Sequence, residues 1–195
     1  MTSFDFSFLV DAAIGLQSAW EAQGLRFCFI GGLAVQHWGE VRMTQDIDAS
    51  VLTGFGNEQP LIEQLLMTLT PRISDAINFA KLNRVLLGQD CHGVPIDVSL
   101  SGMPYEEEVI ERSQRREFLI GKSVRICEAS DLVILKAFAN RVRDWQDIRG
   151  ILIRSASELD WDLIETELRT LTELKEEPEI LTTLLNLRES VSSRS

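Results

Sequence analysis

Hydrophobic positions recur along this chain with two different periods, which predict helices at both ends and strands between them. Residues 4–23 place apolar side chains three or four positions apart, as in an amphipathic helix, and Gly24 follows where a helix would end. Residues 25–30 form a short, largely apolar run typical of a buried strand, and residues 33–38 have the spacing of the first turns of a helix. A polar segment then leads into a second predicted strand, residues 46–52.

The rest of the chain predicts two hairpins and a helical C-terminal third. The predicted hairpins join residues 83–89 to 94–100 and residues 117–120 to 123–127. The predicted helices are 58–69, 130–154 (unbroken, or broken once near 143–147), 158–174 and 178–190. Strands followed by helices indicate an α+β fold, here a mixed sheet flanked by helices. We expect residues 1–128 to form an α/β core and residues 129–195 to form a helical region packed on it.

Composition narrows the class of protein. The 195 residues are 45% hydrophobic and 25% charged, which suits one folded domain with an appendage and disfavours global disorder. The formal net charge of −11 opposes the approach of a phosphate backbone, so broad nucleic-acid binding through net charge is disfavoured. A mononucleotide remains compatible with this charge, because one metal ion and a few local donors can offset the repulsion.

The cellular setting is predicted from the cysteines and the apolar runs. Cys28, Cys91 and Cys127 are widely spaced, as expected of reduced thiols that act as small buried hydrophobic groups. The N-terminus lacks the basic residues of a secretory signal, and no apolar run approaches the ~20 residues of a membrane span. We therefore expect a cytoplasmic protein with no membrane partner.

The segment Thr44-Gln-Asp-Ile-Asp48 carries the strongest chemical signal. Side chains two positions apart in a strand point to the same face, so Asp46 and Asp48 would present two carboxylates while Ile47 packs into the core. Neighbouring carboxylates repel each other, and a divalent cation, Mg²⁺ or alternatively Mn²⁺, removes that repulsion. Taken alone, the tripeptide is more often two solvated acids on an exposed strand face.

Five further residues could line the same cleft. Gly31 and Gly32 end a buried strand and open a helix, where bare backbone N–H groups can cradle a phosphate, although a structural turn also explains them. Arg42 offers a planar fork for phosphate oxygens, and Thr44 offers a hydroxyl. Asp97 lies on a later predicted strand. If that strand pairs beside the first, the carboxylate of Asp97 joins the other two and can take a proton from an attacking hydroxyl.

One predicted helix adds a cation. Helical spacing gives it a polar face, which is either solvated and laced with ion pairs or turned toward a nucleotide whose phosphates Lys136 would reach. The residues of this face are Lys136, Asn140, Arg143 and Asp147. The opposite, core-facing side would carry Ile134, Phe138, Val142 and Trp145.

Together these motifs resemble the nucleotidyltransferase superfamily that includes DNA polymerase β. The resemblance covers about residues 25–150 and rests on Phe29-Ile-Gly-Gly32, Arg42-Met-Thr44, Asp46-Ile-Asp48 and Ile96-Asp97-Val98. Within the superfamily the chain is most similar to the small bacterial AbiEii/AbiGii toxin-type and minimal nucleotidyltransferases. Members of that group often carry a lysine followed by an Arg/Lys-Asp-x-x-Asp run, as residues 136–147 do here.

The resemblance implies an enzyme that moves a nucleoside monophosphate from an NTP to an acceptor hydroxyl and releases pyrophosphate. It implies Asp46, Asp48 and Asp97 as metal ligands, with Asp97 also the general base, and the glycine pair as the contact to the triphosphate. The acceptor would be an RNA such as tRNA, a protein or a small molecule, and a toxin would have a cognate antitoxin protein as partner. Many members have Gly-Ser where this chain has Gly31-Gly32, so one hydroxyl that could contact the phosphates is missing here.

Other chemistries are less consistent with the sequence. His37 and His92 each lack a second metal-binding residue at suitable spacing, which disfavours zinc. Neither a G-x-S-x-G motif nor a P-loop occurs, which disfavours serine hydrolases and P-loop NTPases. The alternative from a different class is a catalytically silent module of the same fold that binds a nucleotide or a partner protein.

Overall fold

The computed structural model describes residues 6–56 and 58–193, and the chain folds into two compact units. The first unit contains the chain as far as Leu33 together with Met43–Cys127, and the second contains Ala34–Arg42 together with the chain from Glu128 onward. The chain therefore passes between the units three times. No helix among the described residues is both long and apolar enough to cross a membrane.

Within the described residues, the first unit is built on a seven-stranded mixed sheet with the strand order β3-β4-β5-β2-β1-β7-β6. The strands are β1 (Phe27–Ile30), β2 (Ile47–Leu52), β3 (Thr70–Pro71), β4 (Val85–Gln89), β5 (Pro95–Ser101), β6 (Gln114–Leu119) and β7 (Lys122–Ile126). Strand β2 runs parallel to β5, and β1 runs parallel to β7, whereas the other neighbours are antiparallel. Both predicted hairpins, β4–β5 and β6–β7, are confirmed.

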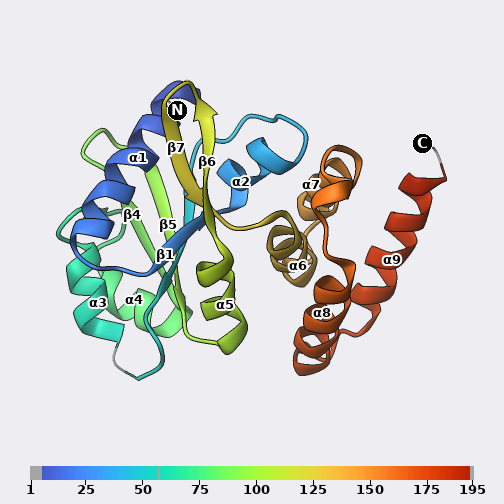
Figure 1. Cartoon of the computed structure of the whole chain (residues 1–195). Coiled ribbons are helices and arrows are strands. Elements are labelled where there is room, and N and C mark those ends of the chain that lie inside the picture. Colours follow the sequence, from blue (N-terminus) through green and yellow to red (C-terminus); the bar gives the residue numbers. More distant parts are fainter. Residues whose placement is uncertain (1–5, 57, 194–195) are drawn as a thin grey trace. The chain divides into compact units, whose positions relative to one another are not determined.

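Helices cover both faces of this sheet. The helices of the first unit are α1 (Phe6–Ala22), α3 (Glu58–Leu65), α4 (Ala76–Asn83) and α5 (Pro104–Arg112), and α2 (Gly31–Trp38) begins in this unit. Helices α1, α3 and α4 lie on one side of the sheet and α5 on the other (Figure 1). The Trp20 ring of α1 packs on Phe27 and Phe29 of β1, with ring centroids 5.2 and 6.0 Å away. The predicted start of the first helix, at residues 4 and 5, lies outside the described residues.

Strand register decides which side chains share a face with α1. Phe29 pairs with Ala49 across β1–β2, and Ala49 pairs with Val98 across β2–β5, so these three residues lie on the face that α1 covers. Because side chains alternate along a strand, Asp48 and Asp97 point to the opposite face. The α+β fold with a mixed sheet is confirmed, and its pairing places two of the predicted acids on one face.

The second unit is helical, as predicted for the C-terminal region. Its helices are α6 (Ala129–Ala139), α7 (Val142–Arg154), the short 3-10 helix η1 (Ala156–Glu158), α8 (Trp161–Lys175) and α9 (Glu179–Ser192). Buried apolar side chains of its core include Leu132, Val133, Ile148, Ile164, Leu168 and Leu184. The chain breaks between α6 and α7 at Asn140, whose φ is 58°, so the predicted break near 143–147 is wrong. Asparagine is one of the few residues that tolerate this left-handed conformation.

Residues 34–42 make their contacts with α7 and the turn that follows it. The Ser155 hydroxyl donates to the Trp38 carbonyl at 2.7 Å, and the Arg154 guanidinium donates to the Gly39 carbonyl at 2.5 Å. The Gly39 backbone lies so close to α7 that a Cβ at this position would be 3.1 Å from Ile151. These bonds explain why a short N-terminal segment belongs to the helical unit.

Candidate functional site

The three predicted acids lie at one end of the paired strands β2 and β5. Asp48 and Asp97 are register partners across the two parallel strands and therefore stand side by side on the same face. Asp46 precedes β2 by one residue and is exposed, Ile47 is fully buried, and Asp48 is half-buried. The predicted alternation, with the acids outward and Ile47 in the core, is confirmed. The condition set for Asp97, that its strand pairs beside β2, is met.

The charges of these acids affect each other. Burial raises the pKa of Asp97, the Arg72 guanidinium opposes that rise, and the negative charge of Asp46 adds to it. Two negative charges that repel each other favour the binding of a cation between them, or of a proton when no cation is bound. In addition to the effect of burial, the charge of Asp46 therefore makes a negative charge on Asp97 less favourable.

A different segment of the chain orients each carboxylate. The Thr44 hydroxyl donates to Asp46 Oδ1 at 2.9 Å, and the Gly32 backbone N–H donates to Asp48 Oδ2 at 3.3 Å. The Arg72 guanidinium donates to Asp97 Oδ1. Sequence reasoning identified Thr44 and Gly32 but missed Arg72, which no local motif marks.

Gly31 and Gly32 bring the start of α2 against the acids. A Cβ on Gly31 would lie 1.9 Å from Asp48 Oδ2, and a Cβ on Gly32 would lie 2.3 Å from Thr44 Oγ1. Gly31 also has a φ of 56°, where a side chain is strained. Asp48 and Thr44 can therefore approach this closely only because neither glycine has a side chain. Contact between the glycine pair and a triphosphate stays a prediction.

This packing gives Gly31→Ala an expected cost in stability. The variant should lose about 3 kcal/mol of unfolding free energy, because alanine must hold a left-handed φ while its Cβ overlaps Asp48. Gly24→Ala is the matched control: its φ is 71°, but a Cβ there meets nothing within 4 Å, so the expected loss is about 1 kcal/mol. Urea unfolding measures both, and equal losses would mean that Asp48 is not held against Gly31.

Arg42 and Lys136 lie in a cluster of ion pairs within the second unit. Arg42 binds Asp147 through two hydrogen bonds, Nε to Oδ1 at 2.6 Å and Nη2 to Oδ2 at 2.9 Å. Lys136 Nζ lies 2.7 Å from Asp147 Oδ2 and 3.1 Å from Asp144 Oδ1, and Arg141 Nε lies 2.6 Å from Asp144 Oδ2. The Lys136, Asp144 and Asp147 side chains are less than a tenth exposed. Nucleotide binding by Arg42 and Lys136 stays a prediction.

The cluster keeps both of its acids ionised at neutral pH. Burial alone would raise the pKa of Asp147, but hydrogen bonds from Arg42 and Lys136 outweigh burial and lower that pKa below its usual value. Burial likewise acts to raise the pKa of Asp144, and the bonds from Arg141 and Lys136 lower it. Sequence reasoning placed Asp147 on the polar face of the helix but gave Asp144 no role, although the Arg-Asp-x-x-Asp run contains both.

The acids at the β2–β5 end suit a divalent cation by their donor chemistry. Mg²⁺ prefers a few carboxylate oxygens and completes its shell with water and phosphate oxygens. Asp48 and Asp97 side by side, with Asp46 one residue before the strand, supply such oxygens. In the chain as described, no three His, Cys, Asp or Glu side chains are already gathered as a metal cluster. The three carboxylates therefore suit the ion by their chemistry, but they would have to move closer together to bind it.

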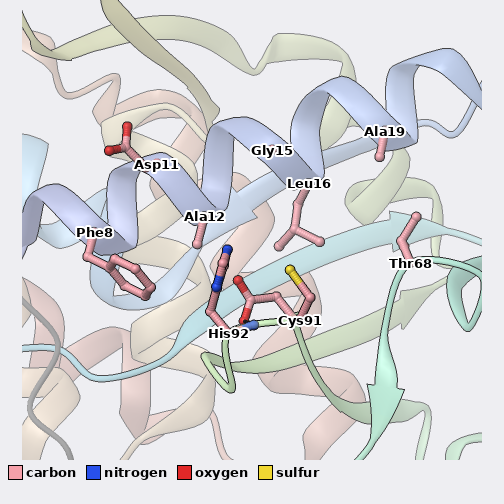
Figure 2. Close-up of a pocket in the computed structure, with 10 residues that line it drawn as sticks. Phe8, Asp11, Ala12, Gly15, Leu16, Ala19, Thr68, Cys91 and His92 are labelled. Carbon is pink, nitrogen blue, oxygen red and sulfur yellow. Dashed lines mark hydrogen bonds between the residues drawn. The ribbon is translucent and has the colours of Figure 1, made fainter.

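A cavity of about 450 Å³ lies elsewhere, on the α1 side of the sheet (Figure 2). Its walls come mainly from apolar residues of α1, such as Phe8 and Leu16, and from the β4–β5 turn, where Cys91 and His92 lie. Strand alternation directs Asp48 and Asp97 to the opposite face, so this cavity is separate from the acids. The exposed Cys91 also corrects the expectation of three buried thiols, since only Cys28 and Cys127 are buried.

Comparison with known proteins identifies the fold but not a family. No protein-family model matches the chain, and no curated protein matches it significantly. An antigenic nucleotidyltransferase-like protein from Paracoccidioides brasiliensis has a similar structure, with a TM-score of 0.52 and 13% identity over 96% of each chain. The fold is nucleotidyltransferase-like. At this identity the similarity shows the fold alone, so membership of the toxin-type subgroup stays a prediction.

Weaker likenesses point to one antibiotic-resistance factor, ANT(2'')-Ia. Its solution structure has a TM-score of 0.43 and 16% identity, over 96% of this chain and 93% of that one. Its complex with adenylyl-2''-tobramycin has the same TM-score and identity, over 95% of this chain and 98% of that one. Both TM-scores are below 0.5, so the fold assignment rests on the first structure alone.

Proposed function

We propose that this chain is a Mg²⁺-dependent nucleotidyltransferase that moves a nucleoside monophosphate from an NTP to an acceptor hydroxyl. The observation that carries the proposal is the register of β2 and β5, which sets Asp48 beside Asp97, with Asp46 one residue before β2. The nucleotidyltransferase-like fold supports it. Mn²⁺ is the alternative ion.

In the proposed reaction, the acceptor oxygen attacks the α-phosphorus while the bond to the bridging oxygen breaks and pyrophosphate leaves. Asp46 and Asp48 would hold the metal, and Asp97 would serve as third ligand and would take the proton of the attacking hydroxyl. Bound Mg²⁺ supplies positive charge beside the attacking and leaving oxygens. Thr44 and Gly32 keep the first two acids in place through their hydrogen bonds.

We also propose phosphate-binding roles for the glycine pair of the first unit and, separately, for Arg42 and Lys136 of the second unit. Arginine binds phosphate oxygens in the same two-point geometry that Arg42 now uses for Asp147. Each cation would exchange a bond to Asp147 for a bond to a phosphate oxygen. Phosphate binding is therefore compatible with the ion-pair cluster, but Asp147 would lose part of the positive charge that now balances its own charge.

The direct test is to incubate the full chain with labelled NTPs, Mg²⁺ and a cell extract. We expect an acceptor to become labelled and pyrophosphate to be released, with both lost when EDTA removes the metal. Mg²⁺-dependent NTP binding measured by calorimetry, without any transfer, would instead favour the catalytically silent module. Label that survives EDTA would contradict the proposed chemistry.

The acceptor and the biological role form the finer part of the proposal. An RNA such as tRNA, a protein or a small molecule can supply the hydroxyl, and the labelled species itself would identify the class. If the chain is a toxin with a cognate antitoxin, its expression should arrest growth, and Asp48→Ala should restore it. Unimpaired growth of cells that express the intact chain would count against the toxin role.

A further inference from the structure

We propose that Arg72 is a resident counter-ion of the candidate metal site, which holds Asp97 when no metal is bound and competes with the metal for that carboxylate. This inference rests on the proposed function, because it concerns how the same site receives its ion. The supporting observations are the backbone position of Arg72, its ion pair with Asp97, and the charge of the acids around it.

The backbone fixes Arg72 at the level of Asp97. Arg72 directly follows β3, and its N–H donates to the Leu87 carbonyl of β4 at 3.0 Å. Leu87 is in turn the register partner of Asp97 on β5. The guanidinium therefore starts from a fixed place two strands away, and it forms an ion pair with Asp97 Oδ1.

This ion pair occupies an oxygen that the proposed metal needs. Asp97 is the one acid of the proposed triad that lies on β5. Its Oδ1 already accepts a hydrogen bond from Arg72. Both side chains are partly open to solvent, Arg72 at 30% and Asp97 at 36% exposure, so the pair can open without unfolding the sheet.

The competition couples the metal to the nucleotide. A metal ion that arrives alone must displace Arg72 from Asp97 and leave the guanidinium without that partner. A metal ion that arrives with a triphosphate brings phosphate oxygens, which accept guanidinium hydrogen bonds well. By linkage, each of the two then strengthens the binding of the other. The site is therefore expected to bind the metal weakly until a nucleotide is present.

The test measures Mn²⁺ binding to the full chain by calorimetry, without nucleotide. We expect Arg72→Ala and Arg72→Gln to bind Mn²⁺ about tenfold more tightly than the wild type, because a competing charge a few ångströms away is gone. Arg72→Lys should stay close to the wild type, since an ammonium group also competes. Arg84→Ala is the matched control, because Arg84 precedes β4 and pairs with Glu58 at 2.7 Å rather than with Asp97.

The outcomes separate this inference from the proposed function. If Asp48→Asn abolishes Mn²⁺ binding but the two Arg72 substitutions do not tighten it, the metal site stands and the role of Arg72 is overturned. If neither the wild type nor any Arg72 variant binds Mn²⁺, or if Asp48→Asn binds it as well as the wild type, the metal site itself is wrong and the inference fails with it. Equal tightening in Arg84→Ala would also overturn the role, because the effect would then be one of net charge.

Discussion

Asp48→Asn is expected to lower the rate of nucleotidyl transfer by about a thousandfold or more, because it removes one of the two charges that hold the metal at the reacting phosphate. Asparagine has nearly the size of aspartate, and its amide oxygen can still accept the hydrogen bond that the Gly32 N–H now donates to Asp48. The substitution therefore changes charge with little change in packing. Initial rates of label transfer at saturating Mg²⁺ and NTP measure the loss.

Asp75→Asn is the matched control for this experiment. Asp75 is an exposed residue of the same unit, and its carboxylate accepts a hydrogen bond from Asn78 at 2.9 Å. The same change of charge at this position should leave the rate within about twofold of the wild type, since solvent and salt screen the charge of an exposed side chain. A wild-type rate in Asp48→Asn would remove Asp48 from the metal site.

Asp147→Ala is expected to lower the free energy of unfolding by about 3–5 kcal/mol, the usual cost of leaving a buried charge without its partner. Asp147 is 4% exposed, and both Lys136 and Arg42 bind it, so its loss takes a partner from two cations at once. Lys136 would keep Asp144, 3.1 Å away, as its remaining partner. Urea unfolding followed by far-ultraviolet circular dichroism measures the change.

An exposed ion pair of the same unit provides the comparison. Glu165 lies 3.5 Å from Arg188, and both side chains are about two-fifths exposed. Glu165→Ala should therefore cost less than about 1 kcal/mol. If Asp147→Ala cost no more than this control, the cluster would contribute little to stability, and Arg42 and Lys136 would be readily available to a ligand.

The strands that carry the acids were predictable because their signal is local. Alternation around Ile47 already predicts that Asp46 and Asp48 point away from the core, and Ile47 is indeed fully buried. That Asp97 stands beside Asp48 depends on a parallel pairing between segments some fifty residues apart, which alternation allows but does not require. The contact between Arg72 and Asp97 crosses a further strand and leaves no pattern in the sequence.

The Lys136 helix shows how one residue changes a helical prediction. An unbroken helix would place Val142 in the core, but the left-handed turn at Asn140 resets the phase, and Val142 is 82% exposed. The core-facing position of Val142 was therefore wrong. Asp144 and Asp147 are buried instead, with Lys136 between them. A prediction from hydrophobic periodicity assumes that the helix is unbroken, so it does not show where one helix ends and the next begins.

Helix α4 buries only small side chains, which leave a weak hydrophobic pattern in the sequence. Helix α4 was not predicted, because the residues that it buries are Ala76 and Ala80, whose side chains contribute little to a hydrophobic pattern. Asn83, the last residue of α4, was instead predicted to begin a strand, whereas the strand begins at Val85. Burial of alanine on a short helix becomes visible only when the neighbouring elements are in place.

The path of the chain between the two units limits how the protein can be divided. A fragment that ends at Cys127 would keep residues 34–42 but lose α7, on which they pack, and Trp38, now 5% exposed, would face water. A fragment that begins at Glu128 would lack the same residues and leave Asp147 without Arg42. A single cut at this boundary does not yield two intact halves, so the two pieces expressed from separate genes should stay soluble only when they are produced together.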